Sequence, residues 1–271
     1  MLTVFKKFSH HSYSFRYLQA MKHFILLTTL CMLPISGAHR IVGGREARAH
    51  SRPYMVSLQI RGQSFCGGSL IYPNWVLTAA HCMEDMRVDM IRVVLGAHNL
   101  RNPDRFVQVL SIQESFTHPE YNPTTFQNDI NLLKLNSFAN INRFVRNISL
   151  PLNDSNVLPG SPCSVAGWGE VSDFGTLPRA LMETDVNVIS RENCNQHWGQ
   201  IIFDSMLCTA SPGQRNKGFC SGDSGGPLVC RNRVEGLVSF SGLFCGDPNT
   251  PDVYTRISAF LPWIQSVISR R

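Results

Sequence analysis

Ten residues near the C-terminal end, numbers 219–228, read FCSGDSGGPL. Two adjacent glycines lose much backbone entropy on folding and offer no side chain for packing, so this stretch suits neither a helix nor a strand interior. Such a backbone is favoured where the chain must approach a ligand closely. Ser224 is a candidate nucleophile, and the amides of Gly222 and Ser224 are candidate donors to a developing oxyanion. A glycine-rich surface turn is the alternative, because Gly-Asp-Ser-Gly also occurs in ordinary loops.

The composition bounds the class of protein. The chain has 271 residues with 20 glycines and 15 prolines, and 16% of its residues are charged. These values favour an all-β protein with many turns, long enough for one large or two small domains. Of the nine cysteines, Cys31 lies in an N-terminal apolar run, and the other eight suit an oxidised, secreted protein. Loop 96–104 holds a single acid, which argues against calcium there, and we expect neither metal nor cofactor.

The formal net charge of +6 comes mostly from the first forty residues, which hold five basic side chains and no acid. Residues 41–271 carry 20 basic and 19 acidic side chains, a net charge of +1. A nearly neutral body argues against nucleic acid as the main partner. Local basic faces, for instance around Arg92, Arg101 and Arg105, have solvated loop arginines as their simpler interpretation.

Residues 1–38 have the features of a signal peptide, with Met21 as an alternative start. An apolar run from Phe24 to Ile35 is followed by Ser-Gly-Ala at 36–38, a small-residue cleavage pattern. The run is shorter than the ~20 apolar residues that cross a bilayer, so we expect no transmembrane span.

A second processing site follows at His39-Arg40, directly before Ile41-Val42-Gly43-Gly44. Cleavage after Arg40 would leave a new ammonium on Ile41, and the glycines behind it would let this terminus enter a pocket. We therefore expect residues 39–40 to be an activation dipeptide and residues 41–271 to be the folded domain. An ordinary strand start is the alternative.

Two further stretches carry the side chains that a serine nucleophile needs. Residues 77–82 read LTAAHC, and residues 128–135 read NDINLLKL, where Asp129 opens an alternating apolar strand. A serine is a poor nucleophile until a base removes its proton, and a buried carboxylate orients a histidine base. His81, Asp129 and Ser224 are therefore a candidate set. A structural histidine and a solvent-facing acid are the alternatives for the first two.

Short strand-like segments recur in both halves of the chain. Residues 136–162 are rich in Asn, Ser and Pro and predict a linker between halves of about 41–150 and 151–271. Two N-glycosylation sequons lie near the linker, at Asn147 and Asn153.

The chain ends in a different pattern. Phe260, Trp263, Ile264 and Val267 are spaced like one face of a helix, with Pro262 tolerable in the first turn. The pattern predicts one C-terminal helix packed on the second half.

The order of histidine, aspartate and serine, with these flanking motifs, resembles the chymotrypsin-like serine peptidases. The resemblance covers residues 41–271 and rests on six motifs: IVGG at 41–44, TAAHC at 78–82, DINL at 129–132, GWG at 167–169, GDSGGP at 222–227 and VYTR at 253–256. All six occurring in order is far more specific than any one of them.

The resemblance implies an all-β fold of two six-stranded antiparallel barrels with the active site between them. His81 and Asp129 would come from the first barrel and Ser224 from the second, and Ser239 would support Asp129. The implied disulfides are Cys66–Cys82, Cys163–Cys230, Cys194–Cys208 and Cys220–Cys245. The freed ammonium of Ile41 would pair with Asp223 and so order the oxyanion hole and the specificity pocket.

The pocket departs from the familiar members of the family. Gly218 stands where trypsin-like enzymes have an aspartate, Phe219 should fill the base, and Ser241 should narrow the entrance. These three residues predict a shallow, elastase-like pocket.

Asp252 changes that prediction, because the family usually has glycine there. A buried carboxylate needs a cation or hydrogen-bond donors. A substrate arginine could reach it sideways with further acceptors nearby, so we expect arginine before the scissile bond. The predicted pocket residues are Gly218, Phe219, Ser221, Ser239, Ser241 and Asp252.

The pocket also resembles that of a granule-protease subgroup of the family, which implies storage in myeloid granules and secretion. The expected partners are protein or peptide substrates, an activating peptidase, serpin-type inhibitors and heparin-like glycans, and we expect a monomer. The alternatives are elastase-like specificity or a non-catalytic, heparin-binding antimicrobial protein. The complete triad and the low charge of residues 41–271 argue against the latter.

Overall fold

A computed structural model of the protein describes residues 43–173, 175–211 and 217–269. The predicted signal peptide, the dipeptide 39–40 and Ile41 lie outside the described residues, as does Cys31.

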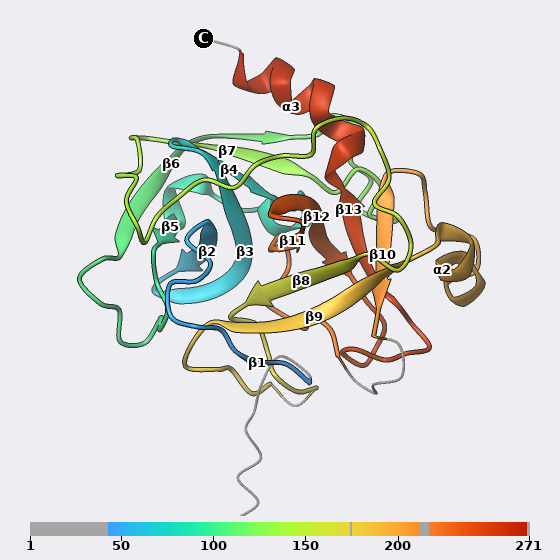
Figure 1. The fold of residues 1–271 in the computed structure, drawn as a ribbon. Helices are drawn as coiled ribbons and strands as arrows, with labels where there is room; N and C mark the ends of the chain where they lie inside the picture. Colours follow the sequence, from blue (N-terminus) through green and yellow to red (C-terminus); the bar gives the residue numbers. More distant parts are fainter. Residues whose placement is uncertain (1–42, 174, 212–216, 270–271) are drawn as a thin grey trace, which may run out of the picture. The chain divides into compact units, whose positions relative to one another are not determined.

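The first half of the chain forms a closed antiparallel barrel of six strands (Figure 1). Its strands pair in the order β2-β3-β4-β7-β6-β5, and β5 closes the barrel on β2. The strands are β2 (Met55–Ile60), β3 (Gln63–Tyr72), β4 (Trp75–Thr78), β5 (Ile91–Leu95), β6 (Gln108–Thr117) and β7 (Asn131–Leu135).

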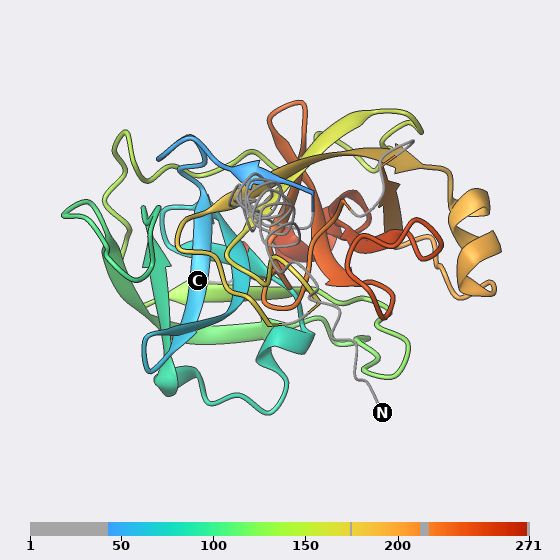
Figure 2. The ribbon, with the colours of Figure 1, turned by 90° about the horizontal axis from the view of Figure 1, so that it is seen from below.

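The second half forms a second six-stranded barrel, closed by the pairing of β8 with β9, and the short strand β1 (Arg45–Glu46) adds to the outside of β9. The strands are β8 (Pro162–Gly167), β9 (Met182–Ile189), β10 (Met206–Ala210), β11 (Pro227–Cys230), β12 (Arg233–Phe240) and β13 (Asp252–Arg256). The two barrels lie side by side when viewed from below (Figure 2). The prediction of an all-β fold with two barrels is confirmed.

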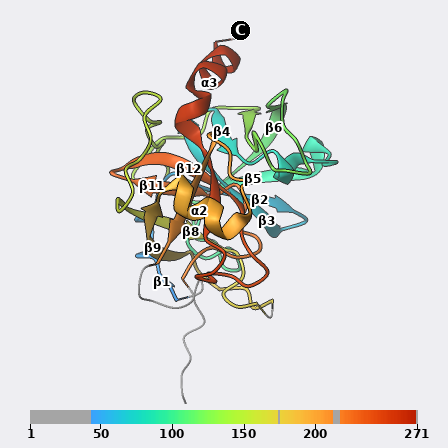
Figure 3. The same cartoon turned by 90° about the vertical axis from the view of Figure 1, so that its right-hand side faces the viewer.

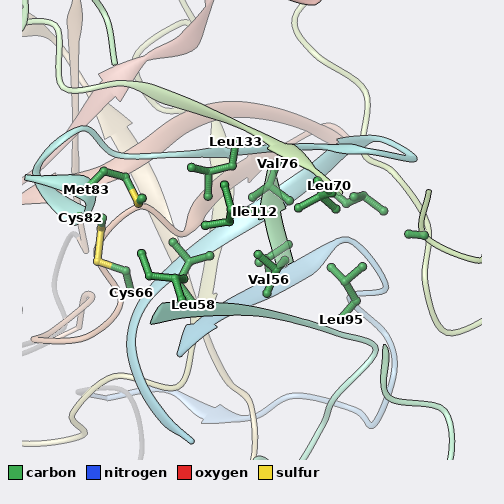
Figure 4. Close-up of a cluster of buried hydrophobic side chains, with 14 of the residues drawn as sticks. Val56, Leu58, Cys66, Leu70, Val76, Cys82, Met83, Leu95, Ile112 and Leu133 are labelled. Atoms are coloured by element: carbon green, nitrogen blue, oxygen red, sulfur yellow. A yellow bond between two sulfur atoms is a disulfide. The ribbon is translucent and has the colours of Figure 1, made fainter. Parts of the chain in front are cut away.

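Each barrel has its own apolar core, because strand residues point alternately inward and outward. In the first barrel, Val56, Leu58, Leu70 and Val76 are fully buried and pack together (Figure 4). A separate cluster in the second barrel is built around Tyr254. A turn at residues 73–74 separates β3 from β4.

The C-terminal helix α3 (Leu261–Ile268) is confirmed, with Pro262 in its first turn. It follows the 3-10 helix η3 (Ile257–Phe260). Ile264 and Val267 are buried in a cluster that also contains Leu77 of the first barrel and Leu237 of the second. The helix therefore packs against both barrels and not only on the second half.

A second α-helix, α2 (Arg191–Trp198), was not predicted from the sequence. It lies on the outside of the second barrel, at the right in Figure 1 and facing the viewer in Figure 3. Its only buried residue is Cys194, so it has no apolar face for a periodicity argument to detect. Its ends do carry a signal. The Ser190 hydroxyl accepts a hydrogen bond from the Asn193 amide at 3.1 Å, and Gly199 ends the helix at φ 61°.

Four disulfides join the described cysteines in the pairings that the family resemblance implies: Cys66–Cys82, Cys163–Cys230, Cys194–Cys208 and Cys220–Cys245. No helix in the described part of the chain is both long and apolar enough to cross a membrane.

Candidate active site

His81 and Asp129 form a hydrogen-bonded pair. His81 opens the short 3-10 helix η1 (His81–Met83), which follows β4, and Asp129 lies two residues before β7. The His81 Nδ1 atom lies 2.8 Å from Asp129 Oδ2, and the His81 amide donates to Oδ1 at 2.9 Å. The Asp129 side chain is completely buried, whereas that of His81 is 19% exposed. The carboxylate is therefore fixed, and the imidazole lies at the protein surface.

Asp129 is also tied to the second barrel. The Ser239 hydroxyl on β12 donates to Asp129 Oδ2 at 2.5 Å, and the Thr255 hydroxyl on β13 donates to the Asp129 carbonyl at 2.7 Å. With the two bonds from His81 and the one from Ser239, the Asp129 carboxylate has three donors, which offset the loss of its hydration. Ser239, predicted both to support Asp129 and to line the pocket, commits its hydroxyl to Asp129. Thr255 was quoted in a motif, but nothing in the sequence indicates this bond.

Ser224 lies in a tight turn that contacts the first barrel. Its carbonyl accepts a hydrogen bond from the Gly67 amide of β3 at 2.8 Å. The Cys82 sulfur lies 3.5 Å from that carbonyl and 3.9 Å from His81 Nε2, so the turn and the imidazole adjoin the same disulfide. A β-carbon on Gly225 would lie 2.2 Å from Thr78 Oγ1, and the glycine is therefore needed for this close approach.

The predicted oxyanion donors lie in the same turn. Gly222 has φ 91°, a conformation that other residues rarely adopt, and a β-carbon there would lie 3.2 Å from Gly169. Within the described part of the chain, the amides of Gly222 and Ser224 donate no hydrogen bond. Both are available to a ligand.

Asp223, the residue before the predicted nucleophile Ser224, is buried. Its carboxylate accepts hydrogen bonds from the amides of Gly169 at 2.7 Å and Cys220 at 3.0 Å. A β-carbon on Gly167 would lie 2.0 Å from Asp223 Oδ1, which gives the Gly-Trp-Gly motif its physical reason. Burial raises the pKa of Asp223 to about 6, against the opposing effect of the two amide hydrogen bonds. Ile41, which is predicted to pair with this carboxylate, and Arg40, the predicted cleavage site, lie outside the described residues.

Asp252 is 4% exposed and has a different environment. Its Oδ2 accepts a hydrogen bond from the Phe219 amide at 3.2 Å, while Oδ1 has no partner among the described residues. A β-carbon on Gly218 would lie 2.2 Å from Oδ2, so glycine is required beside this carboxyl group. Burial raises the pKa of Asp252 well above its ordinary value, and the charge of Asp223 raises it further.

The remaining predicted pocket residues differ in exposure. The Phe219 ring is buried in the core of the second barrel, edge-on to Tyr254 at 5.3 Å. Ser241 is half-buried and Ser221 is exposed. Asp252 and Phe219 are therefore buried, whereas these two serines reach the surface.

An aromatic side chain that the sequence analysis did not select adjoins the pair of His81 and Asp129. Phe126 meets the His81 ring edge-on at 5.6 Å and lies 5.6 Å from the Phe240 ring. Its backbone is left-handed, with φ 55°. A left-handed phenylalanine in a loop carries no sequence signal, so only the structure reveals it.

Neither group of metal-type side chains in the described residues is suited to an ion. Cys66, His81 and Cys82 form one group, and Asp173, Cys220 and Cys245 form the other. All four cysteines are in disulfides and offer no thiolate. The predicted glycosylation residues, Asn147 and Asn153, are exposed.

The fold and this site define a class. Residues 41–264 match the Trypsin family model, and the chain belongs to that family of chymotrypsin-like serine proteases. It is a serine-type endopeptidase. Among curated proteins it is similar to rat (Rattus norvegicus) serine protease 57, with 49% identity covering 89% of this chain and 87% of the relative. Bovine (Bos taurus) duodenase-1 is 43% identical, covering 91% and 96% of the two chains. Among solved structures, human heparin binding protein superposes with a TM-score of 0.78 at 37% identity, covering 85% of this chain and 98% of that one.

Proposed function

We propose that Ser224 attacks the scissile carbonyl while His81 Nε2 takes the hydroxyl proton and later gives it to the leaving amine. Asp129, which binds His81 Nδ1 at 2.8 Å, holds the imidazole in the required tautomer and stabilises its protonated form. The amides of Gly222 and Ser224 donate to the oxyanion. The observation that carries this assignment is the His81–Asp129 pair beside a glycine-rich turn, in which two amides donate no hydrogen bond to any described residue.

The assignment is tested with a serine-reactive phosphonate on protein that starts at Ile41. Ser224 should be the labelled residue, and Ser224→Ala should abolish both labelling and peptide hydrolysis. Labelling elsewhere, or hydrolysis by the alanine variant, would overturn the assignment. A protein that binds heparin but is never labelled would favour the alternative, a non-catalytic binding protein.

Activation is proposed to follow cleavage after Arg40. The new Ile41 ammonium would pair with Asp223, whose buried carboxylate has only amide donors among the described residues. A cation there would stabilise the charged carboxylate and fix the Gly222 turn. Arg40→Gln should leave the chain uncleaved and inactive. If sequencing shows that the variant is uncleaved after residue 40 and the variant is nevertheless fully active, this route is excluded.

The substrate preference proposed for the pocket is arginine before the scissile bond, because Asp252 is a buried carboxyl group and one of its oxygens has no partner among the described residues. Ser221 and Ser241 would be further acceptors. Since Asp252 is 4% exposed, neighbouring side chains would have to shift for the guanidinium to contact it. A peptide library profiled with wild type and Asp252→Gly tests this preference. Valine or alanine preference in both proteins would establish an elastase-like pocket.

The cellular setting is also proposed from the sequence and the relatives. A signal peptide over residues 1–38 would direct secretion, with glycans at the exposed Asn147 and Asn153. Similarity to mouse granzyme B(G,H), at 40% identity over 92% of this chain, supports storage in granules before secretion. N-terminal sequencing of the secreted protein tests the signal peptide, and glycosidase treatment tests the glycans.

A further inference from the structure

A groove beside the linker that joins the two barrels contains none of the residues of the site described above. It has a volume of about 350 Å³, at the lower end of the range of about 300–1,000 Å³ that small-ligand sites occupy. One wall is the linker segment 151–158, and the other is the end of β11 with the start of β12. The second wall offers guanidinium donors and a carboxylate acceptor, from Arg231, Arg233 and Glu235.

Both walls of the groove are held in place. The Arg233 guanidinium donates to the Leu150 carbonyl at 2.8 Å, which ties β12 to the start of the linker. Further along the linker, the Asp154 carboxylate binds Arg256 of β13 at 2.5 Å, and Arg256 is 9% exposed. The groove is therefore preformed, and a ligand would not have to order its walls.

Two leucines on the linker wall are strongly exposed. Leu152 is 80% exposed and Leu158 is 67% exposed, and both line the groove. Single exposed apolar side chains are ordinary, but two that flank one groove indicate a surface that a ligand covers. Apolar side chains on one wall and charged ones on the other favour a ligand with an apolar face and hydrogen-bonding edges. A sugar ring has both, because its C–H groups lie on its faces and its hydroxyls at its edge.

The acceptor residue of the second sequon is itself part of the groove. Asn153 and Ser155, the first and third residues of that sequon, line the groove, and both are exposed. Asn147, the acceptor of the first sequon, is exposed as well but does not line it. A sugar linked to the Asn153 side chain starts at the groove, so its binding is intramolecular and weak contacts are sufficient to hold it there.

We infer that this groove binds the first N-acetylglucosamine of an N-glycan on Asn153. The inference rests on the glycosylation proposed above for that residue and adds a binding site for the sugar. The apolar face of the ring would cover Leu152 and Leu158, and its hydroxyl and acetamido groups would bond to the charged wall. The glycan would then fix the linker to β11 and β12, whereas a glycan on Asn147 would extend into solvent.

The test uses secreted protein with oligomannose glycans, whose occupancy at each asparagine is read by mass spectrometry. Peptide-N-glycosidase F, which cuts between the asparagine and the first sugar, is applied to the native and to the denatured protein. The glycan on Asn147 is the internal control. The groove variant combines Leu152→Gln with Leu158→Gln, two changes at exposed side chains that should leave the fold intact.

In native wild type the Asn153 glycan should be released about tenfold more slowly than the Asn147 glycan, as for a sugar that occupies the groove about nine-tenths of the time. Denaturation or the groove variant should remove this difference. Asn153→Gln should lower the melting temperature by about 2–4 °C, and Asn147→Gln should leave it unchanged. Trimming with endoglycosidase H, which leaves the first sugar on the asparagine, should keep the wild-type melting temperature.

Equal release of the two glycans from the native protein, or slow release that persists in the groove variant, would overturn the inference and leave glycosylation of Asn153 established. An unoccupied Asn153 would refute the proposed glycosylation together with the inference. If the glycosylated protein sediments as a dimer and the groove variant as a monomer, a second copy of the chain occupies the groove and the inference is wrong.

Discussion

Two buried aspartates in this molecule, Asp129 and Asp252, have opposite surroundings. Asp129 receives three hydrogen bonds on its carboxylate from His81 and Ser239. Asp252 receives one, from the Phe219 amide, and its Oδ1 is unpartnered among the described residues. Burial alone therefore does not define the role of a carboxyl group. A satisfied carboxylate is a fixed component of the protein, whereas an unsatisfied one is available to a ligand that supplies the missing donors.

The largest expected effect is at the satisfied carboxylate. Asp129→Asn should lower kcat about 10⁴-fold, because an amide presents a donor to His81 and favours the wrong imidazole tautomer. Hydrolysis of a fluorogenic peptide measures the change, and a thermal melt verifies folding. A loss below tenfold in a folded variant would mean that Asp129 only stabilises the structure.

Asp223 is an intermediate case, with two amide donors and a pKa raised to about 6 by burial. Because the folded state then holds this proton more tightly than the unfolded state, the uncleaved chain loses stability as the pH rises from about 4 to 6. The loss is about 3 kcal/mol, and it is complete at neutral pH. Pairing with the Ile41 ammonium would offset it after cleavage.

Melting temperatures at pH 4.5 and pH 7 of protein starting at Ile41 and of uncleaved Arg40→Gln test this linkage. The melting temperature of the cleaved form should be higher than that of the uncleaved form, mainly at pH 7. Adding Asp223→Asn to the uncleaved chain should remove the contribution of Asp223 to the pH dependence of its stability. The expectation would be contradicted if the difference in melting temperature between the two forms were the same at pH 7 as at pH 4.5.

Asp252 should produce a pH effect on substrate binding. Its raised pKa means that the carboxyl group is neutral at lower pH, and only the ionised form attracts a guanidinium strongly. KM for arginine peptides should therefore fall as the pH rises through this pKa, by up to about 100-fold. Valine peptides and the Asp252→Asn variant are the controls. A parallel KM profile for arginine and valine peptides would exclude Asp252 from recognition.

The smallest effect is expected at Ser239. Ser239→Ala removes one of the three donors to the Asp129 carboxylate and should lower kcat about tenfold with little change in KM. The variant should also reduce the difference between the two aspartates, because the Asp129 carboxylate then has fewer hydrogen-bond donors, as Asp252 does. A rise in KM alone would indicate that Ser239 contacts substrate instead.

Much of the fold could be predicted from the sequence, because six motifs fix the order of strands and turns. His81 and Asp129 were selected from their flanking residues, and the structure brings them within hydrogen-bond distance. Helix α2 was missed because only Cys194 is buried in it, which leaves no periodicity. The hydrogen bond from the Phe219 amide to Asp252 joins segments that are distant in sequence, and a local sequence pattern contains no information about such a contact.

One hydrogen bond has a consequence for how the enzyme fails. The Gly67 amide of the first barrel holds the carbonyl of Ser224, which belongs to the second. Separation of the barrels by a single ångström would break this bond while leaving every strand of both barrels intact. On gentle heating, turnover should therefore disappear at a lower temperature than the far-ultraviolet circular dichroism signal, so the reaction rate reports on the seam between the barrels before any barrel opens.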